Sequence, residues 1–325
     1  MTDRSSAGEA RRAAIAVAHE LDFDEGRRSD IGIVATEAAN NVILHAKSGE
    51  FLVCPFRVGS SAWIDLLALD TGPGIHNVVQ AFEDGYSTIG TAGHGLGAMQ
   101  RLSDAFSLYS LADRGTALWS RFQRDTAAPV RAYGAVNLAM KGETLCGDGF
   151  LAMPGAGRSL YMVVDGLGHG AHAAEAADEA ILTVQGAANE SATEIITRTH
   201  DALKKTRGAA MSVAIVEHER KLLTYAGIGN VSSSILSGTT SRSMVSQNGT
   251  LGAILPRVHE YTYPIQDFST LIMYSDGLNS KCGAAGYPGL LGRPQGLIAG
   301  VLYRDFSRKR DDATVLVAAL GGEAQ

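Results

Sequence analysis

Cysteine is scarce in this chain of 325 residues, and its three cysteines are far apart in the sequence. Cys54, Cys146 and Cys282 provide neither an even disulfide framework nor the close pairs that are typical of a zinc site. The sequence therefore predicts a protein of the reducing cytoplasm whose fold does not depend on disulfides.

Long apolar runs and an excess of positive charge are also lacking. No stretch of about 18 uninterrupted apolar residues occurs, so we expect no membrane-spanning segment and no membrane partner. Residues 1–12 have no apolar centre of the kind found in signal peptides. The formal net charge is −6, which argues against a nucleic-acid partner, because such partners usually require a basic surface.

The composition is that of an ordinary globular protein, with 45% hydrophobic and 19% charged residues. The length favours two domains. We place an N-terminal domain at residues 1–124, a linker that contains Pro129 at residues 125–131, and a C-terminal domain at residues 132–325.

Sequence patterns in the N-terminal part favour helices packed on a sheet. Helices are expected over residues 7–21 and 31–46, the second capped by Ser29 or Asp30. A hairpin, a short helix and two more strands follow, at residues 50–58, 62–69, 98–104, 105–111 and 116–123.

Polar residues recur along the helix expected at residues 31–46. Glu37, Asn41 and His45 are spaced at i, i+4 and i+8, so they share one helical face. A solvated stripe explains such a face equally well when it is taken alone. The glycine-rich run at residues 93–97 precedes the next helix, where backbone N–H groups and the positive helix end can face a phosphate.

Together these segments resemble the four boxes of the gyrase/Hsp90/histidine-kinase/MutL ATP-binding superfamily. The boxes are Glu37-x-x-x-Asn41, Asp70-x-Gly72-x-Gly74, Gly93-His-Gly95-Leu-Gly97 and Gly115-Thr116. Residues 36–46 and 93–106 are most similar to RsbT-like anti-sigma-factor serine kinases. The resemblance covers about residues 8–124 and implies an α/β sandwich of the Bergerat ATP-binding type.

The resemblance assigns a role to each of these residues. Glu37 would polarise a water or a substrate hydroxyl, and Asn41 would hold Mg²⁺ against the phosphates of ATP. Asp70 would accept a hydrogen bond from the adenine amino group, with Thr116 near the adenine. The glycines that would shape the nucleotide pocket and its lid are Gly72, Gly74, Gly93, Gly95 and Gly97.

Aspartates stand at the ends of apolar runs in the C-terminal part. Asp148 lies between two glycines, and Asp165-Gly166 follows the apolar run 160–164. Asp276-Gly277 ends another run, and Asp311-Asp312 opens the run that follows it. A single Asp-Gly turn is usually structural. Several carboxylates gathered at strand ends suit hard divalent cations, which prefer oxygen ligands.

These motifs resemble those of the RsbX/SpoIIE-like branch of the protein phosphatase 2C-like metal-dependent serine/threonine phosphatases. The resemblance covers about residues 132–320 and implies that Asp165 bridges two Mn²⁺ or Mg²⁺ ions, with the Gly166 carbonyl as a further ligand. Asp148, Asp276 and Asp311 would complete the metal shells. A metal-activated water would then attack phosphorus without a protein nucleophile. His169 would either donate a proton to the leaving serine or be part of a turn only.

The expected order of elements in the C-terminal part gives an α+β fold, a β-sandwich flanked by helices. Strands and helices are expected at residues 133–140, 160–164, 172–186, 191–206, 211–217, 221–226 and 231–236. Ser191 and Glu194 form a capping-box pattern at the start of the second helix.

The two resemblances imply a bifunctional partner-switching regulator. The N-terminal domain would bind Mg·ATP and phosphorylate a serine or threonine of a STAS-type anti-sigma antagonist, and the C-terminal domain would remove such a phosphate. A stressosome-type assembly is the implied setting. The alternative is a regulated phosphatase whose N-terminal domain only senses ATP or docks a partner.

Overall fold

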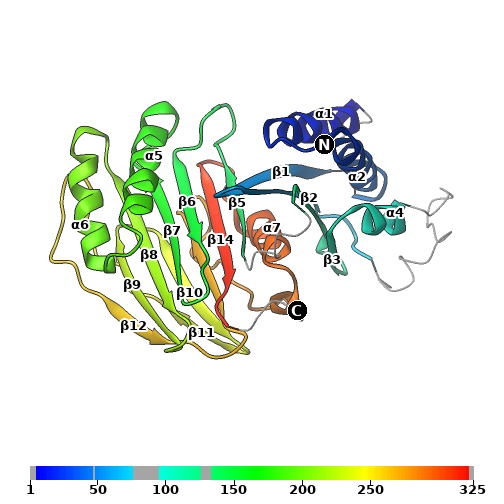
Figure 1. The fold of residues 1–325 in the computed structure, drawn as a ribbon. Helices are drawn as coiled ribbons and strands as arrows, with labels where there is room; N and C mark the ends of the chain where they lie inside the picture. The colour runs from blue at the N-terminus through cyan, green and yellow to red at the C-terminus, as the bar shows by residue number, and fades with distance from the viewer. Residues whose placement is uncertain (1–4, 47, 76–94, 126–132, 322–325) are drawn as a thin grey trace. The chain divides into compact units, whose positions relative to one another are not determined.

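The computed structural model describes residues 5–46, 48–75, 95–125 and 133–321 (Figure 1). The chain forms two compact units, each described here by itself. Unit 1 contains Met1–Pro129 together with Gly292–Arg304, and unit 2 contains Val130–Leu291 and Asp305–Gln325. The expected linker lies almost entirely outside the described residues, and the expected domain limits stay a prediction.

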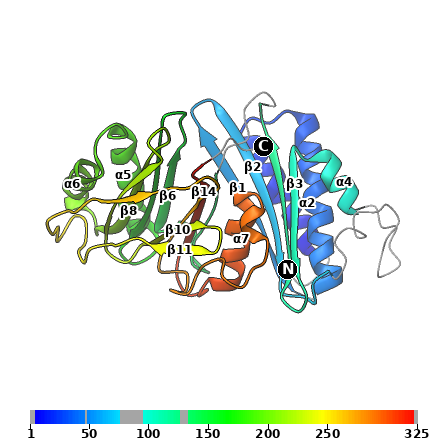
Figure 2. The same cartoon turned by 90° about the horizontal axis from the view of Figure 1, so that it is seen from below.

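Unit 1 is a four-stranded antiparallel sheet with the strand order β1-β2-β4-β3. Its strands are β1 (Gly49–Val58), β2 (Ser61–Asp70), β3 (Ala105–Leu111) and β4 (Gly115–Gln123). Its helices are α1 (Ser5–Glu20), α2 (Glu25–Ala46), α4 (Gly95–Leu102) and most of α7 (Gln295–Phe306). Figure 2 shows α2 and α4 on one side of this sheet and α7 on the other.

Both faces of β2 are buried, because helices cover the sheet on each side. Ile64, Leu66 and Ala68 join the hydrophobic core beneath α1 and α2. Successive residues of a strand point to opposite faces, so Leu67 and Leu69 point away from that core. A Cβ built on Gly300 of α7 would lie 2.8 Å and 3.2 Å from their side chains.

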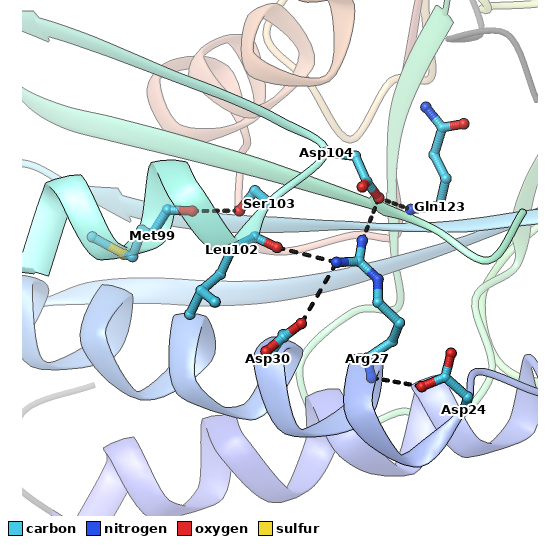
Figure 3. Close-up of polar contacts among 8 residues, drawn as sticks. All are labelled: Asp24, Arg27, Asp30, Met99, Leu102, Ser103, Asp104 and Gln123. Carbon is cyan, nitrogen blue, oxygen red and sulfur yellow. Dashed lines mark hydrogen bonds and ion pairs between the residues drawn. The ribbon is translucent and has the colours of Figure 1, made fainter. Parts of the chain in front are cut away.

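Helix α2 begins at Glu25, so the prediction that it begins at Ile31 is wrong. Asp24 caps the helix instead, since its carboxylate accepts a hydrogen bond from the backbone of Arg27 at 2.9 Å. Arg27 also donates to the carbonyl of Leu102 at 3.2 Å and pairs with Asp104 (Figure 3). These contacts join the first turn of α2 to the end of α4.

Unit 2 is built from two five-stranded sheets, with the orders β11-β10-β13-β14-β5 and β12-β9-β8-β7-β6. The strands of the first sheet are β5 (Tyr133–Leu138), β10 (Ser232–Ser237), β11 (Thr240–Ser243), β13 (Thr270–Tyr274) and β14 (Ala313–Ala319). Those of the second are β6 (Asp148–Met153), β7 (Arg158–Gly166), β8 (Ala209–Glu217), β9 (Leu222–Ile228) and β12 (Tyr261–Pro264).

Helices α5 (Ala171–Gly186) and α6 (Ala192–Ala202) cover the second sheet. Alternate residues of β7, such as Leu160, Met162 and Val164, pack in one core with Ala177 and Ile195 of these helices. The predicted capping box at Ser191 and Glu194 is confirmed. The α+β fold class is confirmed as well. Within the described ranges, no helix combines the length and apolarity needed to cross a membrane.

Candidate nucleotide and metal sites

Asp70 occupies the end of β2 and is held by two backbone amides. Its Oδ1 accepts hydrogen bonds from the amides of Gly72 (2.8 Å) and Thr116 (3.1 Å). Burial raises the pKa of Asp70, while the hydrogen bonds from these amides and the nearby Arg304 and His45 lower it. The carboxylate is therefore fixed in orientation at the end of β2.

The loop after Asp70 is pressed against the β3–β4 turn. Gly74 has a φ of +77°, and a Cβ there would clash with the carbonyl of Leu111. Gly115 has a φ of +88°, and a Cβ there would clash with the carbonyl of Asp70. Both positions require a positive φ and leave no room for a Cβ. Only glycine meets these two requirements, because it has no side chain.

Thr116 is linked to the same loop through Ser110. The Oγ of Ser110 accepts the amide of Ile75 at 2.7 Å and lies 3.0 Å from the Oγ1 of Thr116. The structure thus brings together Asp70, Gly72 and Thr116, to which the family resemblance assigns the adenine end of the pocket; that role stays a prediction.

The other expected nucleotide residues lie along α2 and at the start of α4. Glu37 and Asn41 are half-buried on one face of α2, and a Cβ on Gly95 would lie 3.2 Å from Oε2 of Glu37. His45, eight residues after Glu37, is close enough to Asp70 to affect its pKa. This face therefore extends about 12 Å from the start of α4 to Asp70, since an α-helix rises about 1.5 Å per residue. Gly97 is buried in α4, and Gly93 lies outside the described residues.

The aspartates of unit 2 gather at one end of its sheets. Asp148 and Asp165 are paired across β6 and β7, so both point to the same face. Burial raises the pKa of Asp148 to about 7. The pKa of Asp165 is raised to about 8, mainly by burial and then by the negative charges of Asp148, Asp276 and Asp311. Four carboxylates are therefore within electrostatic reach of one another.

Neighbouring polar groups hold two of these carboxylates in place. Ser275 donates a hydrogen bond from its Oγ to Oδ2 of Asp148 at 2.6 Å. Asn230 donates from Nδ2 to Oδ2 of Asp276 at 2.7 Å. Both bonds fix the orientation of a carboxylate that the sequence assigns to a metal.

Asp311 and Asp312 have different surroundings. Asp312 is buried, and its two oxygens accept the amides of Met140 (2.7 Å) and Gly147 (2.9 Å). Asp311 is exposed and lies near Asp165. The backbone amides engage both oxygens of Asp312, which leaves Asp311 as the better placed ligand; its metal role stays a prediction.

The donor set fits a hard divalent cation in its chemistry. All four side chains offer carboxylate oxygens, and their mutual repulsion is the kind of charge that a bound cation relieves. Among the residues that the structure describes, however, no three acidic, histidine or cysteine side chains lie close enough to enclose an ion. Gly166 is tightly packed beside them, and its amide donates to the Gly147 carbonyl at 3.0 Å.

The sequence analysis did not identify Arg207, a positively charged side chain beside the loop that follows β7. The guanidinium of Arg207 lies so near Gly168 that a Cβ there would be 2.8 Å from Nη1. The next residue, Gly208, accepts the amide of Leu167 at 3.0 Å. The position of Arg207 just before a strand that pairs with β7 was the only signal for it.

His169 has an acidic partner that the sequence did not indicate. Its Nδ1 lies 2.8 Å from Oε1 of Glu143. His169 also lies near Asp311, which places the imidazole at the edge of the carboxylate group. The contact with Glu143 fixes one ring nitrogen and leaves the ring beside the site.

Comparison with known proteins finds two family models that match separate parts of the chain. The family model "Stage II sporulation protein E (SpoIIE)" matches residues 155–320, just over half of the chain. This chain belongs to the SpoIIE family. The model "Histidine kinase-like ATPase domain" matches residues 2–122 of the SpoIIE-family chain.

Two curated relatives from Bacillus subtilis match the two parts separately. "Serine/threonine-protein kinase RsbT" is 36% identical over 107 residues, which cover 33% of this chain and 80% of the relative. "Phosphoserine phosphatase RsbX" is 31% identical over 144 residues, which cover 44% of this chain and 72% of the relative.

A solved structure of RsbX in complex with magnesium is similar to the fold. It has a TM-score of 0.50 and 25% identity, and the match covers 57% of this chain and 94% of that structure. The SpoIIE-family chain is therefore a fusion of a kinase-like ATPase domain with a phosphatase-family domain.

Proposed function

We propose that the chain is a two-sided switch that phosphorylates a partner through its N-terminal part and removes the phosphate through its C-terminal part. The observation that carries the phosphatase half is the group of four carboxylates at one end of unit 2. The similarity to RsbT and RsbX supports placing both activities in one partner-switching system.

In the phosphatase half, Asp165, Asp148, Asp276 and Asp311 would hold Mg²⁺ or Mn²⁺, with the Gly166 carbonyl beside them. The bound metal would supply a water activated for attack on phosphorus. Ser275 and Asn230 keep two of the carboxylates oriented.

Two further residues of unit 2 would act on the substrate. Arg207 would bind phosphate oxygens, since a guanidinium matches their geometry. His169, oriented by Glu143, would pass a proton to the leaving serine oxygen.

In the kinase half, Asp70 would bind the adenine amino group and Asn41 would hold Mg²⁺ against the phosphates of ATP. Glu37 would accept the proton of the attacking hydroxyl. Phosphoryl transfer requires mostly positioning and charge stabilisation, which these side chains on α2 and β2 can provide.

We propose a STAS-type anti-sigma antagonist as the substrate, within a stressosome-type assembly. The similarity to RsbT and RsbX supports this partner class, because a kinase and a phosphatase on one chain imply a common target.

Two substitutions test the two halves separately. Asp165→Asn should abolish metal-dependent hydrolysis of a phosphoserine peptide, and hydrolysis that persists in EDTA would exclude a metal mechanism. Glu37→Ala should abolish phosphorylation of the STAS protein while Mg·ATP still binds, as calorimetry would show. Phosphorylation by Glu37→Ala would remove the role of Glu37. ATP binding by the wild type without any transfer would favour the sensing or docking alternative.

A further inference from the structure

Helix α7 is separated in the sequence from the rest of unit 1. In the sequence, its residues come after Asp276 and before Asp311, two of the aspartates assigned to the metal site of unit 2. Even so, Gly292–Arg304 form one compact unit with the N-terminal part of the chain. Residues 296–303 of α7 are all buried.

Three residues of α7 share one helical face toward β2 and β4. Gly296, Gly300 and Arg304 are spaced at i, i+4 and i+8. A Cβ on Gly296 would clash with Nε1 of Trp119 and lie 2.6 Å from Oδ2 of Asp65. The two glycines therefore allow the helix backbone to approach the sheet closely, and this approach carries Arg304 to the end of β2.

The sheet beneath Gly296 carries a buried ion pair beside the indole of Trp119. Asp65 and Arg121 form a buried bidentate ion pair with distances of 2.6 Å and 2.7 Å. The guanidinium of Arg121 lies 5.1 Å from the ring centroid of Trp119. This rigid group cannot yield to an added methyl as an exposed side chain would.

Arg304 contacts Asp70, the residue to which the adenine-binding role is assigned. Its Nη1 donates a hydrogen bond to the backbone carbonyl of Asp70 at 3.0 Å. The amides of Gly72 and Thr116 hold the carboxylate of the same residue. Arg304 therefore fixes the main chain of Asp70, whereas the two amides fix its side chain.

The other end of α7 is bonded to the loop that follows Asp276. The carbonyl of Phe306 accepts the amide of Asn279 at 2.8 Å, and the amide of Arg308 donates to Gly277 at 2.8 Å. Only two to four residues of chain separate Arg304 from Phe306 and Arg308, whose hydrogen-bond partners follow closely after Asp276 in the sequence.

We propose that Arg304 is a positioning residue of the nucleotide site and that α7 links occupancy of that site to the metal end of unit 2. This inference rests on the proposed nucleotide binding. It predicts that the nucleotide site is incomplete without residues 292–304, and that nucleotide binding changes the phosphatase rate.

The test uses the full-length chain and isothermal titration calorimetry with Mg·ADP. Arg304→Ala should weaken ADP binding about tenfold, as expected for the loss of a charged hydrogen bond, and Arg304→Lys should restore part of the loss. Gly296→Ala should also weaken binding, because α7 can no longer lie against Trp119. Gly292→Ala is the matched control, since nothing lies within 4 Å of a Cβ there.

A second readout separates positioning from general damage. At fixed free Mn²⁺, hydrolysis of a phosphoserine peptide by the wild type and by Gly292→Ala should change at least twofold when ADP saturates. Arg304→Ala, measured at saturating ADP, should lose this response. Equal ADP affinity in Arg304→Ala and the wild type, or a wild-type rate indifferent to bound ADP, would overturn the proposal. If the wild type binds no nucleotide, the proposed nucleotide function itself fails and this inference with it.

Discussion

The carboxylate group of unit 2 should weaken the metal-free fold, and Asp165→Asn should reveal by how much. Asparagine keeps the shape of the side chain and removes its charge. Without metal, the substitution should therefore raise the stability of the protein at pH 8, although the same change removes metal-dependent activity.

The sign follows from the raised pKa values. Asp165 keeps its proton in the folded protein up to about pH 8, whereas an unfolded aspartate loses it near pH 4. The native state thus binds more protons between these limits, so stability falls as the pH rises through this window. Below about pH 4, Asp165 is protonated in both the folded and the unfolded state, so its charge does not lower the stability.

The magnitude can be bounded from the same values. The rise of the pKa of Asp165 from 3.8 to about 8 corresponds to a free-energy difference of about 5 to 6 kcal/mol, because each pKa unit is worth about 1.4 kcal/mol. The side chain is only half-buried and its neighbours titrate with it, so we expect about 2 kcal/mol from one substitution. That corresponds to a Tm increase of about 5 °C for a unit of this size.

The assay is thermal unfolding in EDTA at pH 5 and pH 8, repeated with saturating Mn²⁺. Asp165→Asn should be more stable than the wild type at pH 8, with a smaller difference at pH 5, and Mn²⁺ should stabilise the wild type more than the variant. Asp178→Asn, an exposed aspartate of α5, is the control. An Asp165→Asn protein less stable than the wild type at pH 8 in EDTA would refute the reasoning.

Three other substitutions test separate parts of the account. Arg207→Ala should raise KM for a phosphoserine peptide about tenfold, with partial recovery in Arg207→Lys; an unchanged KM would remove Arg207 from phosphate binding. Asp312→Ala leaves two backbone amides unpaired, so urea unfolding should show a loss of about 2 to 4 kcal/mol, and a loss below about 1 kcal/mol would contradict a structural role. Arg27→Ala breaks the link between α2 and Leu102, so hydrogen exchange should rise in residues 95–104 while β1 and β2 stay protected; uniform exchange throughout unit 1 would show global destabilisation instead.

Most strands could be predicted from the sequence, because each combines an apolar run with a turn signal at its end. Apolar runs followed by Asp-Gly turns indicated β7 and β13 and so placed their aspartates at the sheet ends. The start of α2 could not be predicted from its polar first turn, since the contacts of Arg27 with Leu102 and Asp104 depend on the folded sheet.

Helix α7 was not predicted at all. Its sequence contains two glycines, which disfavour helices in isolation. Close packing on β2 reverses that preference, because only glycine allows the approach. The sequence of β2 contained an indication of this helix. Residues 63–69 are apolar on both faces apart from Asp65, which indicates that other elements pack on both sides of the strand.

The site residues divide in the same way. The four aspartates could be proposed because they stand beside apolar runs in the sequence, and the Asp70 box because it resembles a family motif. Ser275, Arg207 and Glu143 could not, since each acts on a residue more than twenty-five positions away or through a neighbouring strand.

The central claim, that one chain acts on one partner from both sides, is tested most directly by the phosphorylation state of a STAS protein. Phosphatase-deficient Asp276→Ala would be incubated with Mg·ATP and the STAS protein, and the phosphate would be measured by mass spectrometry. We predict a phosphorylated partner from which added wild-type protein then removes the phosphate. A partner that stays unphosphorylated while ATP binds to the chain would contradict the claim and leave a nucleotide-sensing phosphatase.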